Sequence, residues 1–340
     1  MVSIVKPIIY RTTQSTLFNC CLQLLENAEE NRGNLLRVLT YHRVDELGKN
    51  DNLHPGMISA TPAEFARQIK QISKTYHVLS MNTVLDAIEK QTPLPARSVL
   101  ITFDDAYRDF AKHAWPILKE QKLPVTLFVP TAFPDQPQHV FWWDRLYAAL
   151  THANNSAEIT IENHCYLLNT PQAINFSFKK IRNVIKSLPH QQAMLEIDRI
   201  CVELNSPTVS NSVLGWDELR QLAKEGVTLA PHTQTHPLLN RLDLETAMKE
   251  STGSLNDLRR EIGEALPVIA YPAGGVNNRV AERLCNEGFK LAFTTRRGLN
   301  NLDRADRFQL RRINVGKGTS LPIFRTQLLR QFRWFNNCWS

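Results

Sequence analysis

Short hydrophobic runs alternate with helix-like segments along most of this chain, and that alternation limits the folds open to it. The runs are rich in Val, Ile, Thr and Phe and are predicted to be strands; they cover 37–42, 98–104, 125–130, 227–232, 268–272 and 290–295. Helix-like segments lie between them, over 62–75, 82–90, 109–121, 216–225, 243–262 and 277–287. Apolar strands that alternate with helices favour a parallel sheet covered on both faces. The chain is therefore predicted to be an α/β protein whose sheet is open or closed into a barrel.

The alternation is interrupted between about residues 134 and 213. This segment begins with the aromatic sequence FWWD, continues through a polar stretch, and carries two helical patterns of its own, 176–187 and 189–204. It is predicted to be a helical insertion in a connecting loop rather than an independent domain. Loops at the carboxyl ends of barrel strands build active sites, so the insertion is expected to form a wall or lid.

The rest of the chain divides into three parts: an N-terminal helical extension (1–34), the barrel (35–318) and a basic aromatic tail (319–340). No window approaches about 20 consecutive apolar residues, the length of a spanning helix. Lys6 and Pro7 interrupt the apolar stretch that a signal peptide needs. The six cysteines are scattered, without a C-x-x-C pair, which suits reduced thiols. A cytoplasmic protein is expected.

Positive charge is concentrated at the C-terminal end. The net charge is +7, and the segment 307–340 holds seven Lys and Arg residues and no Asp or Glu. Its sequence IFRTQLLRQFRWFNNCW is typical of a basic amphipathic helix, which could lie peripherally on an anionic membrane at its inner face. The alternative is a closing helix packed on the barrel with its arginines in water. No nucleic-acid-binding motif accompanies the basic residues, so a nucleic-acid partner is not expected.

Four chemically reactive side chains stand at the ends of predicted strands. Asp104 and Asp105 end one strand in the sequence TFDDAY, and His232 ends another, with His236 four residues later in HTQTH. A carboxylate and two imidazoles supply three ligands for a divalent cation, and imidazole favours zinc over magnesium. The second carboxylate could then accept a proton from water, because the cation relieves the repulsion between the two acids.

Each motif alone has a simpler explanation. Asp105 or Asp109 could cap the following helix, and an H-x-x-x-H spacing arises by chance on helix surfaces. Together, at strand ends of a predicted barrel, the two motifs favour a shared metal site.

The same motifs resemble a known family. TFDDAY resembles the TFDD(G/A) motif of NodB-type polysaccharide deacetylases, a carbohydrate esterase family, and HTQTH resembles its H-(S/T)-x-x-H motif. YPAGG (271–275) is similar to the third family motif, and LTYHRV (39–44) to the N-terminal signature of one branch. The resemblance covers about residues 36–315. It implies a deformed (β/α) barrel with a zinc-like metal that hydrolyses N-acetyl groups on sugars.

The resemblance also implies roles for individual residues. Asp104 would be the general base, and Asp105, His232 and His236 would bind the metal, most simply Zn²⁺. Backbone N–H groups near Tyr271 would stabilise the oxyanion.

Two departures from the commoner family pattern concern the proton donor and an arginine. No histidine follows His236, whereas the commoner pattern places the general acid there; in one branch it comes from the first strand, where His42 stands. His42 is therefore the candidate acid, the alternative being a core histidine bonded to a backbone carbonyl. The third motif lacks the arginine that orients the catalytic aspartate. Arg312 in LRRINV could reach the site from a later strand, but a surface arginine is the expectation.

The aromatic residues Trp142 and Trp143, followed by Asp144, open the insertion. Their rings could stack on a sugar while the carboxylate accepts its hydroxyl hydrogens, or they could simply pack the insertion onto the barrel.

The predicted function is a metal-dependent hydrolase that removes N-acetyl groups from an amino sugar of a polysaccharide or lipid-linked glycan. The alternatives are a related hydrolase acting on another C–N bond, such as a formamido sugar or a small cyclic amide, and a catalytically idle barrel that binds glycan or membrane.

Overall fold

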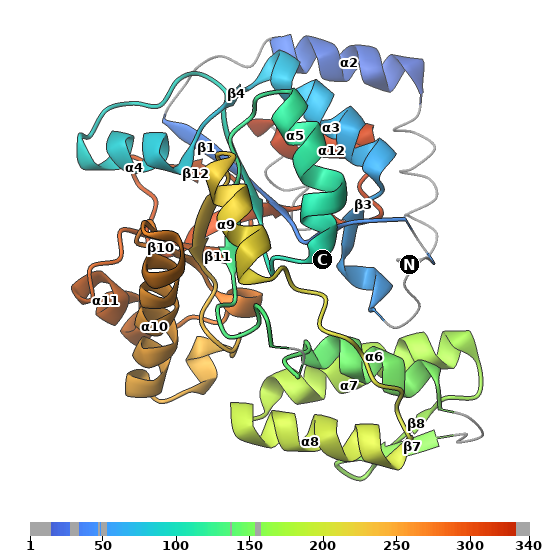
Figure 1. Cartoon of the computed structure of the whole chain (residues 1–340). Coiled ribbons are helices and arrows are strands. Elements are labelled where there is room, and N and C mark those ends of the chain that lie inside the picture. Colours follow the sequence, from blue (N-terminus) through green and yellow to red (C-terminus); the bar gives the residue numbers. More distant parts are fainter. Residues whose placement is uncertain are drawn as a thin grey trace.

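The centre of the molecule is a parallel sheet that curls into a nearly closed barrel (Figure 1). The computed structural model describes residues 15–27, 34–46, 48, 53–136, 138–153 and 158–330. In spatial order the strands are β10 (Val268–Ala270), β11 (Leu291–Arg297), β13 (Leu310–Asn314), β1 (Leu35–Tyr41), β5 (Ser98–Phe103), β6 (Thr126–Val129) and β9 (Thr228–Pro231). Two short strands extend the sheet: β4 (His77–Val78) pairs with β5, and β12 (Asn300–Asn301) pairs antiparallel with β1.

The two ends of this strand order lie close together. The imidazole Nδ1 of His232, which follows β9, is 2.7 Å from the carbonyl oxygen of Ala270 in β10. The predicted α/β fold, a deformed (β/α) barrel, is therefore confirmed.

Helices surround the barrel in the order that the sequence predicts. They are α3 (Pro62–Thr75), α4 (Met81–Glu89), α5 (Trp115–Glu120), α9 (Trp216–Lys224), α10 (Leu244–Ile262) and α11 (Asn278–Asn286). A π-helical turn, η2 (Phe110–Ala114), precedes α5, and 3-10 turns occupy η1 (Pro55–Met57), η3 (Leu239–Arg241) and η4 (Pro272–Gly274). Side-chain caps fix several helix starts: Thr61 accepts from Glu64 N, and Asp243 accepts from Thr246 N.

The strands bury both faces, and β1 illustrates why. Leu36 and Val38 point into the barrel, where they belong to an apolar cluster with residues of the other strands. Tyr41 points outward and packs edge-on against Phe65 of α3, with ring centroids 5.1 Å apart. The near-continuous apolar runs in the sequence reflect this burial on both sides.

The insertion forms a lobe beside the carboxyl ends of the strands (Figure 1). It contains α6 (Trp142–Thr151), a hairpin of β7 (Glu158–Ile161) and β8 (His164–Leu167), α7 (Pro171–Ser187) and α8 (His190–Glu203). The helical patterns 176–187 and 189–204 correspond to α7 and α8. The sequence did not predict α6 or the hairpin. A further two-stranded pairing, β2 (Arg43–Val44) with β3 (Ile58–Ala60), lies beyond β1.

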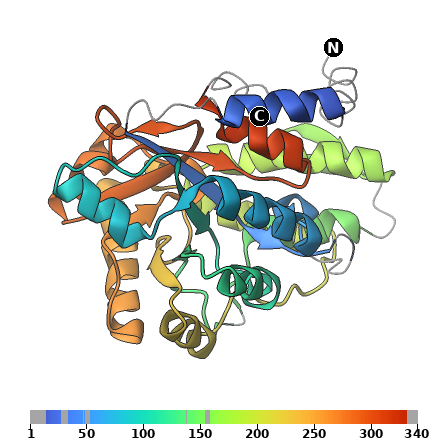
Figure 2. The same cartoon turned by 90° about the horizontal axis from the view of Figure 1, so that it is seen from above.

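The two ends of the described chain pack together. Helix α2 (Thr16–Asn27) lies beside α12 (Leu321–Leu328), blue beside red in Figure 2, and Arg325 pairs with Glu26 at 2.7 Å. Leu328 and Leu329 of the predicted amphipathic tail are fully buried in the fold. The remainder of that tail, 331–340, lies outside the described residues. Within the described ranges no helix is both long and apolar enough to cross a membrane.

Candidate active site

The candidate residues meet at the carboxyl ends of neighbouring strands. His42 follows β1 directly, and Asp104 follows β5; the two strands pair with Tyr41 opposite Phe103. Asp105 comes next along the chain, and His232 follows β9. The site is therefore assembled by parallel register, which brings residues that are distant in the sequence to one end of the barrel.

Both motif loops contain residues with left-handed backbone geometry. Asp105 has φ 73°, Ala106 φ 50°, Thr233 φ 66° and His236 φ 62°. Such conformations are uncommon for residues other than glycine and cluster at functional sites. The His loop is held from α10, where Glu250 Oε2 accepts hydrogen bonds from the backbone N–H groups of residues 234 and 235 at 2.9 and 2.8 Å.

Asp105, His232 and His236 form a compact buried group. Asp105 Oδ1 lies 3.4 Å from His232 Nε2 and 3.3 Å from His236 Nε2. A tetrahedral ion with bonds of about 2.0–2.1 Å separates its ligand atoms by about 3.3–3.4 Å. Oδ1 of Asp105 is buried without a hydrogen-bond partner. Within the described part of the chain these three residues are the one cluster of potential metal ligands. The donor set and its spacing fit a zinc-sized cation.

The surroundings prepare the three side chains for a cation. His232 Nδ1 donates to the carbonyl of Ala270, which leaves Nε2 facing the group. Burial alone would raise the pKa of Asp105, but the two imidazoles lower it well below its usual range. Burial lowers the pKa of His236, which favours the neutral, ligating form. For His232, burial is outweighed by Asp105 and Asp104, and its pKa is raised, so protons compete with a cation for this residue.

Asp104 is held by Arg312. Nη1 and Nη2 of Arg312 donate to Oδ1 and Oδ2 of Asp104 at 2.8 and 2.7 Å, and Arg312 Nε donates to Thr294 O at 2.8 Å. Burial would raise the pKa of Asp104, but the guanidinium outweighs it and the pKa is lowered. The expectation of a surface arginine was wrong, because Arg312 lies in β13 with its side chain inside the barrel. Arg311 beside it is exposed, as strand alternation requires.

His42 faces Asp104 from the other side. Its Nε2 is 4.0 Å from Asp104 Oδ2, and its side chain is 28% exposed. Its backbone N–H donates to Ser59 Oγ at 2.9 Å, which fixes the turn after β1. This exposure to the cavity does not fit a core histidine.

The five residues His42, Asp104, Asp105, His232 and His236 line one cavity of about 340 Å³. The other lining residues come from the segment 54–59, from α6 and α7 of the insertion, from β11, and from loops after other strands: His54, Gly56, Met57, Ser59, Trp142, Trp143, Arg182, Lys186, Leu238, Ala273, Thr295 and Val315. The insertion thus forms one wall of the site.

Trp142 and Trp143 line this cavity and are also well packed, with exposed fractions of 8% and 7%. The Trp143 ring contacts His236 at 5.1 Å between centroids, and its Nε1 donates to Tyr107 Oη at 2.9 Å. Tyr107 Oη donates in turn to Asp144 Oδ2 at 3.1 Å. Both interpretations of the tryptophans therefore apply: they pack the insertion onto the barrel and present surface to the cavity.

Asp144 does not reach the cavity. It is buried and accepts hydrogen bonds from His54 N at 2.7 Å and from Tyr107 Oη. Burial raises its pKa to about 7. The expectation that its carboxylate contacts a sugar was wrong, because α6 turns it inward.

Tyr271 also lies outside the cavity. Its N–H donates to Phe293 O at 2.9 Å within the sheet, and its hydroxyl donates to Phe308 O at 3.0 Å. Its donors are therefore already used, and the expected oxyanion contact of Tyr271 is not present. Ala273, two residues later in η4, is the part of this motif that lines the cavity.

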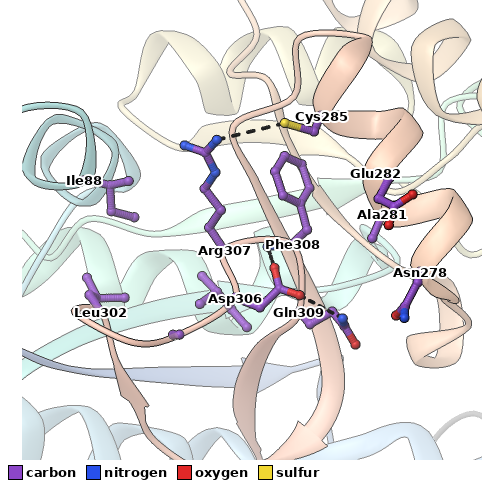
Figure 3. Close-up of a pocket in the computed structure, with 12 residues that line it drawn as sticks. Ile88, Asn278, Ala281, Glu282, Cys285, Leu302, Asp306, Arg307, Phe308 and Gln309 are labelled. Atoms are coloured by element: carbon purple, nitrogen blue, oxygen red, sulfur yellow. Dashed lines mark hydrogen bonds between the residues drawn. The ribbon is translucent and has the colours of Figure 1, made fainter.

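A larger cavity of about 650 Å³ lies away from these strand ends, between α4 and α11 (Figure 3). One of its carboxylates already has partners: Asp306 accepts from Phe308 N and Gln309 Nε2, both at 2.8 Å. Arg307 points toward Cys285 Sγ, 3.9 Å away. None of the candidate catalytic residues borders this cavity.

Known proteins with similar sequences and folds are deacetylases. The family profile described as polysaccharide deacetylase matches residues 91–292. YxkH of Bacillus subtilis (strain 168), provisionally assigned as a polysaccharide deacetylase, is 20% identical over 228 residues, which are 67% of this chain and 55% of YxkH. The chain thus spans about half the length of that relative.

Solved structures agree on the fold. The deacetylase PplD of Streptococcus pyogenes, solved in complex with acetate, has a TM-score of 0.59 at 18% identity, covering 87% of this chain and 99% of PplD. IcaB from Ammonifex degensii has a TM-score of 0.56 at 18% identity, covering 87% and 98%. His42 and Arg312 lie outside the segment matched by the family profile, although they complete the same site.

Proposed function

Because this chain belongs to the polysaccharide deacetylase family, we propose that it is a metal-dependent hydrolase that removes N-acetyl groups, or similar N-acyl groups, from an amino sugar of a glycan. Family membership implies deacetylation of a glycan. The observation that carries the finer proposal is the Arg312-bound Asp104 beside the Asp105, His232 and His236 group.

Asp105, His232 and His236 would hold the metal ion, most simply Zn²⁺. When bound, such an ion polarises the amide carbonyl and stabilises the negative charge that develops on its oxygen. Among the described residues Asp105 pairs with the two histidines and with no Lys or Arg, which supports its assignment as a ligand rather than a base.

Asp104 would accept the proton of the attacking water. Each of its oxygens uses one acceptor site for Arg312 and keeps another free. The lowered pKa of Asp104 keeps it ionised at neutral pH, as a general base must be. Arg312 positions it without contacting the reacting atoms.

His42 would protonate the departing amine. It stands 4.0 Å from Asp104 and faces the same cavity, so a base and an acid would both be within reach of an amide bound there. An amine is a poor leaving group unless its nitrogen gains a proton. Among the described residues of the cavity lining, the other imidazoles belong to His54 and to the two metal-facing histidines.

The cavity suits a small polar unit such as one acylated sugar. Its volume of about 340 Å³ is at the lower end of the range for ligand sites, about 300–1,000 Å³. The two tryptophans supply apolar surface for the C–H face of a sugar ring.

The decisive experiment is acetate release by the purified, Zn²⁺-loaded protein from acetylated amino-sugar oligosaccharides. Asp104→Asn should lower turnover about 10²–10⁴-fold while metal content is unchanged. A protein that binds no metal, and whose Asp104→Asn variant behaves identically on every substrate, would contradict the proposal.

A further inference from the structure

Two cations of the insertion face the catalytic cavity. Arg182 and Lys186 stand one turn apart on α7, and both line the cavity that holds Asp104 and His42. Neither side chain is exposed, and burial together with Arg182 lowers the pKa of Lys186.

These cations have no acidic partner in the described part of the chain. Nε of Arg182 is buried without a hydrogen bond. The acids of the cavity lining are Asp104, which Arg312 neutralises, and Asp105, which contacts two imidazoles. Withdrawing an unpaired cation from water costs free energy. A ligand that brings a negative charge to this wall would offset that cost.

The positive charge extends beyond the main cavity. A small adjoining hollow shares Trp142, Lys186 and His236 with it, and its lining adds a further cation, Arg241. On the other side, burial and then Arg182 and Lys317 lower the pKa of His54 to about 3, so this histidine faces cations as well. The cations Arg182, Lys186 and Arg241 on this wall favour an anionic ligand.

We propose that Arg182 and Lys186 bind an anionic group, a phosphate or a carboxylate, on the same glycan whose acyl group is hydrolysed. Arginine and lysine form charge-assisted hydrogen bonds with both kinds of oxyanion. The substrate class is thus an acidic glycan: a sugar phosphate or a uronic-acid-containing chain. That the acyl group is hydrolysed in this same cavity rests on the proposed function, but binding of the anionic group can be measured without turnover.

Lys179 and Lys180 offer a matched control on the same helix. Both are exposed, as an ordinary solvated face would be. Replacing them with glutamine removes the same charge as replacing Arg182 and Lys186, without touching the cavity.

The test compares Arg182→Gln/Lys186→Gln with Lys179→Gln/Lys180→Gln. Calorimetric titration with N-acetylglucosamine 1-phosphate and with an N-acetylglucosamine–glucuronate disaccharide should show at least tenfold weaker binding to the first variant only. For neutral acetylated chitooligosaccharide, the first variant should lose at least tenfold less affinity than it loses for the acidic probes, and the control variant should bind all probes as wild type does. Tighter binding of the phosphate or of the uronate probe identifies the source of the anion, and either preference supports the proposal.

Three outcomes overturn the proposal. Wild type could bind the acidic and neutral probes with equal affinity, the control variant could lose as much affinity for the acidic probes as the cavity variant, or the cavity variant could lose as much affinity for the neutral sugar as for the acidic probes. If no substrate releases acetate but the phosphate probe still depends on Arg182 and Lys186, the proposed function fails and the anion site stands.

Discussion

Arg312 binds both oxygens of Asp104 through two parallel hydrogen bonds of 2.8 and 2.7 Å, and both side chains are buried. The two residues are 208 positions apart and are joined by the order of the strands, with β13, β1 and β5 side by side. The pair fixes the orientation of the carboxylate and keeps it charged. An ion pair in this setting is best understood as a device for positioning, because burying it gains little net stability.

Arg312→Met is expected to lower the free energy of unfolding by about 3–5 kcal/mol, because it leaves the charge of Asp104 buried and uncompensated. Turnover should fall about 10²-fold or more, because the base becomes mobile and its pKa rises. Urea unfolding and initial rates measure the two effects. Arg311→Met, on the exposed face of the same strand, is the matched control.

The double variant Arg312→Met/Asp104→Asn should recover most of the lost stability and none of the activity, since it removes both charges. Additive losses of stability in this cycle would show that the two side chains do not interact as the structure has them.

His42→Ala is expected to lower amide hydrolysis about 10²–10⁴-fold, because no side chain then protonates the departing amine. An activated aryl acetate, whose leaving group needs no proton, should lose far less. Rates on both substrates, with metal content measured alongside, distinguish a proton donor from a structural residue. Near-normal amide turnover at unchanged metal content would refute the role of His42, as would equal losses on both substrates.

Most of the barrel could be predicted from the sequence because its strands are apolar runs between helix patterns. β13 was absent from the predicted strands, and a later strand was considered only as a way for Arg312 to reach the site, because LRRIN carries two arginines among its apolar residues. Only the partner carboxylate, supplied by a distant strand, makes a buried arginine there stable. Because this partner is distant in the sequence, the sequence alone led us to expect Arg312 on the surface.

The site was partly predictable for a similar reason. Asp104, Asp105 and His232 stand at strand ends, and parallel strands bring their carboxyl ends together. The direction of a side chain after a strand depends on the local turn, so the sequence could not show that Tyr271 points away and that Ala273 lines the cavity instead. Arg182 and Lys186 have the spacing of an ordinary helix surface, and only the folded insertion turns them toward the site.

Addition of Zn²⁺ to metal-free protein is expected to raise its melting temperature. A ligand present at 100 times its dissociation constant stabilises the folded state by about 2.7 kcal/mol. His236→Ala should lose this response, and His164→Ala, on the exposed hairpin, should keep it. Thermal unfolding with and without the metal measures this independently of activity. An unchanged response in His236→Ala would remove this residue from the metal site.

Asp144 is expected to make stability depend on pH. Its pKa is raised by burial to about 7 in the folded protein, against about 3.9 in an unfolded chain. Between these values the folded state binds more protons than the unfolded chain. The contribution of Asp144 to stability is therefore fully present below about pH 4 and is lost as the pH rises to about 7, by about 1.4 kcal/mol per pH unit. Asp144→Asn lacks this proton but can still accept the hydrogen bond from His54 N. The stability of wild type relative to Asp144→Asn should therefore decline from pH 4.5 to 7 and stay constant above pH 7, as measured by urea unfolding at each pH.

The control is Asp86→Asn, at a carboxylate whose side chain is 61% exposed; it should show no comparable slope. A difference that is flat, or that grows with pH, would mean that Asp144 is ionised throughout and that its hydrogen bonds outweigh its burial.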